Sequence, residues 1–271
     1  MPLITISRSI GSGGGVIAAK VAEALKVELY DDLKLQHTAI DMGIPLEDLK
    51  SLDEKAPWFF DRLLSRKPES YLSIMESVVY KVAQEGQGVI LGHGSQWLLR
   101  VFDCAFHVYI HSTGSSRIRY IMETKGMSRE AAEKLVAKTD NEQSGFFRYA
   151  FHMDWNDPSL YDLIINTEKL GIEAAAKLIV DTAGSEALSE CSLTAVGGME
   201  RLSLKKRVEA AILETDINPY LFSIEVPEKG VVHLNGTTYS EEEKNKLIRV
   251  VRQVSGVSNV KVEIGIMPAG V

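Results

Sequence analysis

The chain of 271 residues has only two cysteines, Cys104 and Cys191. Two thiols cannot form a disulfide framework, and no Cys/His spacing resembles a metal site, so no metal-binding residues are expected in the chain itself. Cys104 begins an apolar stretch, residues 104–110, which indicates a buried and inert thiol. The sequence therefore excludes a disulfide-rich scaffold and a Cys/His metal centre.

Long apolar runs and an excess of positive charge are also missing. No run reaches the length of a membrane span, and Met1-Pro2-Leu3 leads into a strand-like segment instead of a signal sequence. We therefore expect a cytoplasmic protein. The net charge of −7 argues against a general nucleic-acid surface, and no nucleic-acid partner is expected, although a small basic cleft for phosphates would be hidden in that average.

The strongest motif covers residues 3–25. A run rich in β-branched residues breaks into glycines and then into an alanine-rich segment whose apolar residues recur three and four apart, which predicts strand, tight loop and helix. Glycines let consecutive backbone N–H groups face an anion, and the helix N-terminus adds unpaired donors. This layout indicates a phosphate-binding turn, with a merely flexible turn as the alternative. The predicted nucleotide-binding residues are Arg8, Ser9, Gly11, Ser12, Gly13, Gly14 and Gly15.

The loop departs from the P-loop template of Gly, four residues, Gly, Lys and Ser or Thr. If Gly13 takes the second glycine, Arg8 stands at the first, Gly14 at the lysine and Gly15 at the magnesium-binding hydroxyl. We therefore expect the backbone part of a phosphate-binding loop without the lysine side chain that usually accompanies it.

Strand-like and helical segments alternate through residues 1–183, which predicts a parallel sheet covered by helices. Asp31 follows a predicted strand and is expected at the ligand edge of the sheet, as a substrate-orienting carboxylate or as the N-cap of the next helix. His93, flanked by glycines, is expected at the same edge. Residues 33–85 are predicted to be mostly helical, with Pro45, Pro57 and Pro68 at the breaks, and could grip a phosphoryl acceptor.

Basic side chains follow on two predicted helices between residues 117 and 148. Such side chains on a mobile helical hairpin are what a phosphoryl-transfer lid requires. Each one taken alone is better explained as a solvated surface charge, so the indication comes from the order of the segments. Residues 186–201 lack a clear period and predict a linker between a first domain, residues 1–185, and a second, residues 202–271. The second domain is predicted to be a small α+β module that begins with a helix at 203–215.

Residues 1–185 resemble the cytidylate kinase-like family, a branch of the P-loop nucleoside monophosphate kinases. The resemblance implies a P-loop kinase fold and phosphoryl transfer from ATP or another nucleoside triphosphate, with Mg²⁺, to a small acceptor such as CMP. Through the matching positions Arg117 and Asp140 it implies catalytic roles for these two residues, and Arg119 and Arg148 are catalytic candidates as substitutes for family arginines that are missing here. Asp31 and His93 are the substrate-binding candidates because of their expected place at the ligand edge of the sheet. The resemblance rests on residues 6–8, 11–14, 30–31, 92–94 and 117–118, on Asp140, and on residues 155–158 and 161–163.

Three positions depart from the family pattern, in which arginines usually stand at Gly15, His93 and Gln143. Arginines of this kind can be worth ~10³–10⁵ in rate, so their loss would leave binding intact and catalysis slow. The sequence therefore leaves enzymatic activity open. A phosphotransferase is the first hypothesis, a non-catalytic nucleotide-sensing pseudokinase the second, and an oligomer scaffold the third.

The last seventy or so residues resemble a BON domain through residues 230–236 and 255–260. The resemblance implies contact with a ligand, a partner or a membrane. The alternative is a module that dimerises or packs on the first domain, which keeps a homo-oligomer among the expectations.

Overall fold

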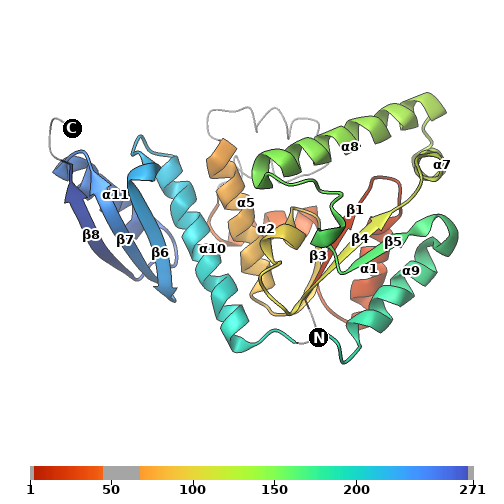
Figure 1. Cartoon of the computed structure of the whole chain (residues 1–271), viewed down its shortest axis with the longest axis horizontal. Helices are drawn as coiled ribbons and strands as arrows, with labels where there is room; N and C mark the ends of the chain where they lie inside the picture. The colour runs from red at the N-terminus through yellow and green to blue at the C-terminus, as the bar shows by residue number, and fades with distance from the viewer. Residues whose placement is uncertain (1–2, 45–67, 189, 268–271) are drawn as a thin grey trace.

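The computed structural model describes residues 3–44, 68–188 and 190–267 (Figure 1). Five parallel strands form one sheet in the order β2-β3-β1-β4-β5. This arrangement confirms the predicted α/β fold and places β1, which leads into the glycine loop, at the centre of the sheet. The strands are β1 (Leu3–Arg8), β2 (Leu29–Tyr30), β3 (Gly88–Leu91), β4 (Ala105–His111) and β5 (Leu163–Asn166).

Helices cover both faces of this sheet. Ile4 and Ile6 of β1 pack on one face, where α1 and α9 lie, whereas Leu3 joins the cluster on the other face with α2, α5 and the end of α8. Because both faces of the sheet are covered, Leu3–Ser7 of β1 are all buried, including the polar Thr5 and Ser7. The helices are α1 (Gly14–Leu25), α2 (Asp32–Asp41), α5 (Pro68–Ala83), α6 (Ser95–Leu98), α7 (Gly114–Lys125), α8 (Arg129–Phe151) and α9 (Thr167–Ala183), with a short 3₁₀ helix at Pro158–Leu160.

The predicted helical segment 33–85 is seen at its two ends, α2 and α5. Pro68 begins α5, as its fixed φ favours, while Pro45 and Pro57 lie outside the described residues. Within the described ranges no helix is both long and apolar enough to cross a bilayer.

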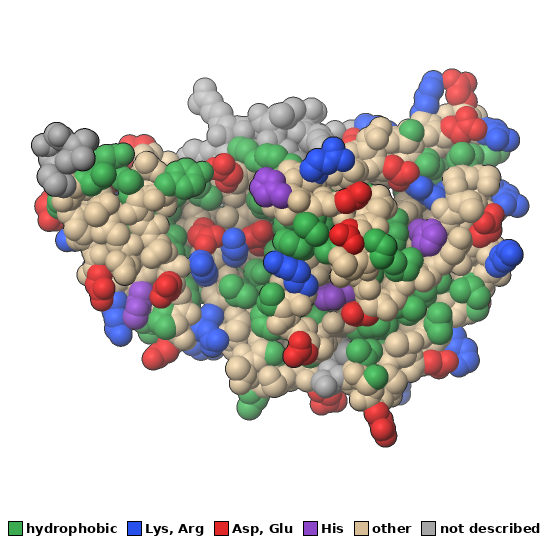
Figure 2. Space-filling model, in the orientation of Figure 1, with side chains coloured by type: hydrophobic (Ala, Val, Ile, Leu, Met, Phe, Trp, Pro, Cys, Tyr) green, Lys and Arg blue, Asp and Glu red, His purple; other side chains and the backbone are tan. Residues whose placement is uncertain are grey.

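The C-terminal part is a separate three-stranded sheet in the order β6-β7-β8, with β6 antiparallel and β8 parallel to β7. Helices α10 and α11 supply buried apolar side chains to its core, so the predicted α+β module is confirmed. On the face seen in Figure 2, acidic and basic side chains are interspersed over both sheets' domains. The elements are α10 (Leu193–Leu213), a 3₁₀ helix at Pro219–Leu221, β6 (Phe222–Glu228), β7 (Val231–Thr238), α11 (Glu241–Gln253) and β8 (Asn259–Ile266).

Helix α10 begins at Leu193, earlier than the predicted start at 203, and therefore includes much of the segment predicted as a linker. Its first half buries Met199 in the N-terminal core, and its second half buries Leu204 and Val208 in the C-terminal core. Gly198 permits the close approach, because a Cβ there would lie 3.3 Å from the Phe102 ring. The limits of the two domains remain a prediction, since one helix serves both cores.

A buried ion pair joins α10 to α5, which lie side by side in Figure 1. Lys206 Nζ lies 2.7 Å from a carboxylate oxygen of Glu76 and 2.9 Å from one of Glu209. Burial raises the pKa of the Glu76 carboxyl although Lys206 opposes this effect. Burial alone would lower the pKa of Lys206, but the two carboxylates outweigh it and the pKa is raised. The attraction between α5 and α10 at this contact therefore requires that Glu76 and Lys206 are both charged.

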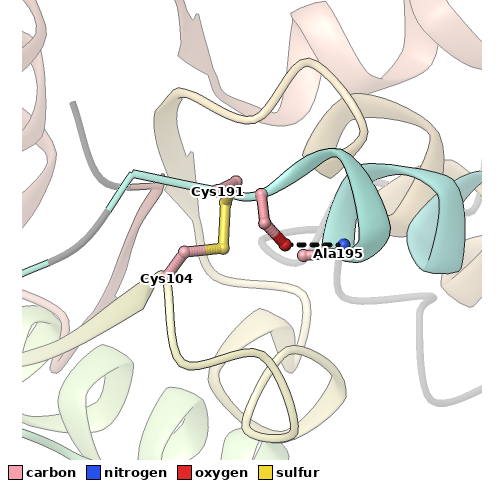
Figure 3. The surroundings of a disulfide bond; sticks show 4 residues. Cys104, Cys191 and Ala195 are labelled. Carbon is pink, nitrogen blue, oxygen red and sulfur yellow. Dashed lines mark hydrogen bonds between the residues drawn. A yellow bond between two sulfur atoms is a disulfide. The ribbon is translucent and has the colours of Figure 1, made fainter.

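The prediction of an inert Cys104 thiol is wrong, because Cys104 forms a disulfide with Cys191 (Figure 3). Cys104 directly precedes β4, and Cys191 lies just before α10, whose N-cap Ser192 accepts a hydrogen bond from the Ala195 N–H. The two cysteines are 87 residues apart in sequence. Only the return of the chain after α9 brings them together, which no local spacing reveals.

We expect Lys206→Met to lower the free energy of unfolding by about 3 kcal/mol, since it leaves Glu76 buried without its partner. Lys205→Met is the matched control, because Lys205 lies 3.8 Å from Glu209 at a more exposed position, and it should change stability by less than about 0.5 kcal/mol. Chemical denaturation of both variants measures the difference. Equal effects would contradict the structural role of the pair.

Reduction of the disulfide should destabilise the protein, because the bond closes a long loop in the unfolded chain. For a sequence separation of 87 residues, the loop-entropy model gives about 4–5 kcal/mol. We expect a reductant to lower the unfolding midpoint by about 10 °C in the wild type and to have no effect on the Cys104→Ser/Cys191→Ser double variant. An unchanged midpoint in wild-type protein whose thiols are shown by mass spectrometry to be reduced would refute this expectation.

Candidate functional site

The glycine loop, residues 9–13, connects β1 to the N-terminus of α1. Gly11 and Gly13 have φ values of 78° and 79°, in the left-handed region that favours glycine. Gly14 has no such φ, but a Cβ there would lie 2.4 Å from Arg8 Cβ. Gly15 has open space around it, so packing does not require glycine at that position. The backbone thus forms the kind of compact turn that the sequence predicts for a phosphate loop.

The serine hydroxyls of the loop face the protein interior. Ser9 Oγ lies 2.9 Å from the Tyr109 hydroxyl, and Ser12 Oγ donates to the carbonyl oxygen of Ser9 at 2.8 Å. Thr167 Oγ1 in turn donates to the carbonyl oxygen of Ser12 at 2.9 Å. Both serines are buried. Their side chains therefore brace the loop against β4 and α9, while ligand contact from this loop is left to backbone groups.

Arg117 connects α7, the glycine loop and α8. Its guanidinium donates two hydrogen bonds to the Asp140 carboxylate, at 2.9 and 2.6 Å, and its Nε donates to the carbonyl oxygen of Ile10 at 2.7 Å. The Arg117 side chain is buried, which strengthens such charge-assisted bonds. The structure therefore brings the predicted residues Arg117 and Asp140 together as a clamp on the loop.

The other two predicted basic residues, Arg119 and Arg148, lie apart from this clamp. Both are exposed, and their side chains donate to Ser116 Oγ and Ser144 Oγ on their own helices. The structure does not bring them to the glycine loop, in keeping with the alternative of surface charges.

The acidic pair after β2 divides into two roles. Asp31 caps α2, since its carboxylate accepts the Lys34 backbone N–H at 3.0 Å. Asp32, which the sequence analysis did not single out, lies 2.9 Å from Nε2 of His93. The register of α2 decides which carboxylate faces the loop after β3, and adjacent acidic residues alone do not reveal it. His93 is buried, with a left-handed φ of 58° between Gly92 and Gly94.

A pocket lies beside the glycine loop, between the ends of β1 and β3 and helix α8. The volume of the pocket is about 500 Å³, including the part that is open to solvent. Sequence reasoning missed its helical wall, because the aromatic run at 146–151 gives no signal of which rings face a pocket. The lining residues are Ser7, Arg8 and residues 92–94 on the strand side, and Gln96, Glu142, Gln143, Phe146, Phe147 and Trp155 on the helical side.

Two tyrosines and a tryptophan support the floor of this region. The Tyr109 ring stacks on Tyr161 at 5.0 Å and meets Trp155 edge-on at 5.3 Å. The Tyr161 hydroxyl donates to the carbonyl oxygen of Trp155 at 2.7 Å. Burial raises the pKa of Tyr109 and of Tyr161, so both stay neutral and keep their hydroxyl protons.

A parallel sheet with a left-handed glycine loop between its central strand and a helix defines the P-loop kinase class of α/β proteins. The chain belongs to the cytidylate kinase-like family, whose profile matches residues 3–169. The BON domain profile matches residues 202–268. Both matches confirm the resemblances in the sequence.

Curated relatives support the same assignment. A cytidylate kinase from Pyrococcus horikoshii is 27% identical over 183 residues, 66% of this chain and 88% of the relative. One from Pyrobaculum arsenaticum is 28% identical over 184 residues, 67% of this chain and 92% of the relative. The solved structure of an uncharacterized protein from Eubacterium ventriosum matches with a TM-score of 0.51 and 20% identity, covering 69% of this chain and all of that one. This likeness concerns the fold alone.

We expect Arg117→Lys to lower the free energy of unfolding by about 2 kcal/mol, because a lysine cannot make both bonds to Asp140 and the bond to Ile10 at once. Arg119→Lys is the matched control on the same helix and should shift stability by less than about 0.5 kcal/mol. Thermal unfolding of the two variants in parallel provides the measurement. A control that loses as much stability as Arg117→Lys would argue against the clamp.

Proposed function

We propose that the protein binds a nucleoside triphosphate at residues 9–15 and transfers its terminal phosphate to a small acceptor such as CMP. The observation that carries this proposal is the glycine loop, where two left-handed glycines and one close approach form a backbone cradle before a helix N-terminus. Family membership supports a nucleotide kinase-like function. That the nucleotide is ATP and the acceptor is CMP goes beyond this general function and is part of the proposal.

The residues present fit a triphosphate better than they fit a resident metal ion. A Cβ at Gly11 would clash with the Arg117 backbone and one at Gly14 with the Arg8 side chain, so these glycines permit the compact turn that places the N-terminus of α1 for an anion. Among the described residues no group of three His, Cys, Asp or Glu side chains could hold a metal, and Gly15 offers no hydroxyl. Mg²⁺ would thus be carried by the nucleotide phosphates, where it supplies charge neutralisation.

The chain's own contribution would be positioning and charge. The backbone N–H groups at the start of α1, residues 13–15, would hold the phosphates, and Arg117 keeps the glycine loop against α8. Arg8 ends β1 and lines the pocket, so it supplies positive charge near the region between nucleotide and acceptor. No covalent intermediate is required. In this scheme Arg119 and Arg148 keep their predicted roles only if α7 and α8 move when nucleotide binds, whereas His93 already lines the pocket and Asp31 caps α2.

A second candidate function is a nucleotide-sensing pseudokinase. It is favoured by the positions of the lid cations: Arg117 is committed to Asp140 and Ile10, while Arg119 and Arg148 bond within their own helices. Helix α10, shared by both cores, offers a direct connection from the first domain to the BON domain. In this alternative the BON domain would contact a ligand, a partner or a membrane.

Calorimetric titration with ATP and Mg²⁺, followed by an assay of ADP formation across nucleoside monophosphates, separates the two functions. Binding with turnover on one acceptor supports the kinase and identifies its substrate. Saturable binding without turnover supports the sensor. Absence of binding refutes both.

The remaining expectations belong to the same proposal. They are a cytoplasmic location, nucleotide as the principal partner, a homo-oligomer, and ligand or membrane contact through residues 202–271. Light scattering on the purified protein tests the oligomer, and sedimentation with lipid vesicles tests membrane contact.

Gly13→Val should abolish ATP binding, because it places a β-branched residue at a φ of 79° and a Cβ 3.0 Å from Ile172 Cγ1. We expect an affinity loss of at least about 100-fold, which corresponds to about 2.7 kcal/mol. Gly114→Val at the start of α7 is the control, since a Cβ at Gly114 meets nothing within 4 Å. Unchanged ATP affinity in Gly13→Val, measured by calorimetry, would remove the phosphate-loop assignment.

A further inference from the structure

Gln96 on α6 has a buried amide whose orientation is fixed by its neighbours. Its side chain is only 3% exposed and lines the pocket beside the glycine loop. The Tyr161 hydroxyl donates its proton to the Trp155 carbonyl oxygen, so towards Gln96 it acts as an acceptor, and Gln96 Nε2 donates to it at 3.3 Å. The nitrogen of the amide therefore faces Tyr161. Its oxygen, Oε1, is buried with no donor among the described residues.

Gln143 on α8 presents a second oxygen of the same kind to the same pocket. Its Nε2 donates to the Arg8 carbonyl oxygen at 3.5 Å, and its Oε1 is buried without a donor in the described part of the chain. A buried acceptor without a donor costs free energy, and native structures keep few of them. Two such oxygens in one pocket indicate that a bound ligand supplies the missing donors.

The chemistry of these groups limits what the ligand presents to them. Carboxamide oxygens accept hydrogen bonds, and the nearby Glu142 carboxylate also lines the pocket, so a phosphate group would meet acceptors and negative charge there. Phe146, Phe147 and Trp155 contribute aromatic surface, which suits a planar ring. The side of the pocket formed by α6 and α8 is therefore suited to a ring that carries N–H donors, whereas the positively charged Arg8 lies on the strand side.

We infer that this pocket binds the ring of the phosphoryl acceptor, and that Gln96 and Gln143 select rings which present amino N–H groups. The inference rests on the proposed function, because it places the ring of the acceptor in the pocket beside the phosphate loop. Cytosine carries an amino group where uracil carries a carbonyl oxygen, so uracil would set an acceptor against the two amide oxygens. The geometry thus assigns base discrimination to two glutamines on different helices, Gln96 on α6 and Gln143 on α8.

Binding of CMP and UMP, measured by calorimetry without ATP, tests this inference independently of catalysis. The wild type should bind CMP at least about tenfold more tightly than UMP. Gln96→Met removes the amide at similar volume and should bring the CMP/UMP ratio close to one, with ATP·Mg²⁺ affinity unchanged. Gln253→Met makes the same chemical change at an exposed position of α11 and should keep the wild-type ratio.

Two results would overturn the inference: equal binding of CMP and UMP by the wild type, or a Gln96→Met variant that weakens both and keeps their ratio. If Gln96→Met does not fold, Gln143→Met provides the same comparison from α8. The outcome is distinguishable from failure of the proposed function. Loss of ATP binding or of ADP formation would refute that function, whereas the CMP/UMP ratio reports on the pocket alone.

Discussion

The contacts of Arg117 hold together the parts on which a phosphate site at this edge of the sheet depends. One guanidinium bonds the Asp140 carboxylate on α8 and the Ile10 carbonyl oxygen in the glycine loop. A Cβ on Gly11 would lie 2.7 Å from the Arg117 backbone oxygen, so the loop also packs directly on the start of α7. The conformation of the loop and the position of α8 are therefore coupled, and the pocket between them inherits its shape from this one residue.

Helix α10 creates a second dependence, between the two domains. Met199 belongs to the core of the first domain and Val208 to the core of the second, while the Lys206 ion pair with Glu76 fixes the register of α10 on α5. A helix buried at both ends does not behave as a flexible linker. Any displacement of the BON domain would thus act on α5, which carries part of the sheet's covering layer. This continuity gives the sensor hypothesis a physical route, although coupling itself has to be measured.

The strand, loop and helix order of the first domain could be predicted because each segment carries a local signal, such as the apolar run of β1 followed by residues 11–15. The helices and strands of the second domain could be predicted from local signals in the same way. The predictions that were wrong concern features that depend on contacts between distant parts of the chain. The Cys104–Cys191 bond spans 87 residues, and the early start of α10 at Leu193 is stabilised by packing on α5 instead of by its own pattern. Local periodicity contains neither fact.

The candidate site shows the same division. Residue types in the loop predicted a backbone cradle, and the structure has its left-handed glycines at Gly11 and Gly13. The pairing of Asp32 with His93 was hidden, because a one-residue difference in helix register decides whether Asp31 or Asp32 faces the β3 loop. Gln96 was invisible for a related reason. Its importance comes from a chain of hydrogen bonds through Tyr161 to the Trp155 backbone, which exists only once the sheet is assembled.

Together these contacts divide the site into two regions of opposite character. At the start of α1 the backbone N–H groups of the first helical turn have no acceptor within the helix, which suits an anion. In the adjoining pocket the available groups are the amide oxygens of Gln96 and Gln143, which suit a donor-bearing ring. A small molecule lying across both regions would need a phosphate at one end and a ring with N–H groups at the other. Under the proposed function, His93 and Gln143 at positions where the family usually has arginines would shift part of acceptor recognition from charge to hydrogen bonding.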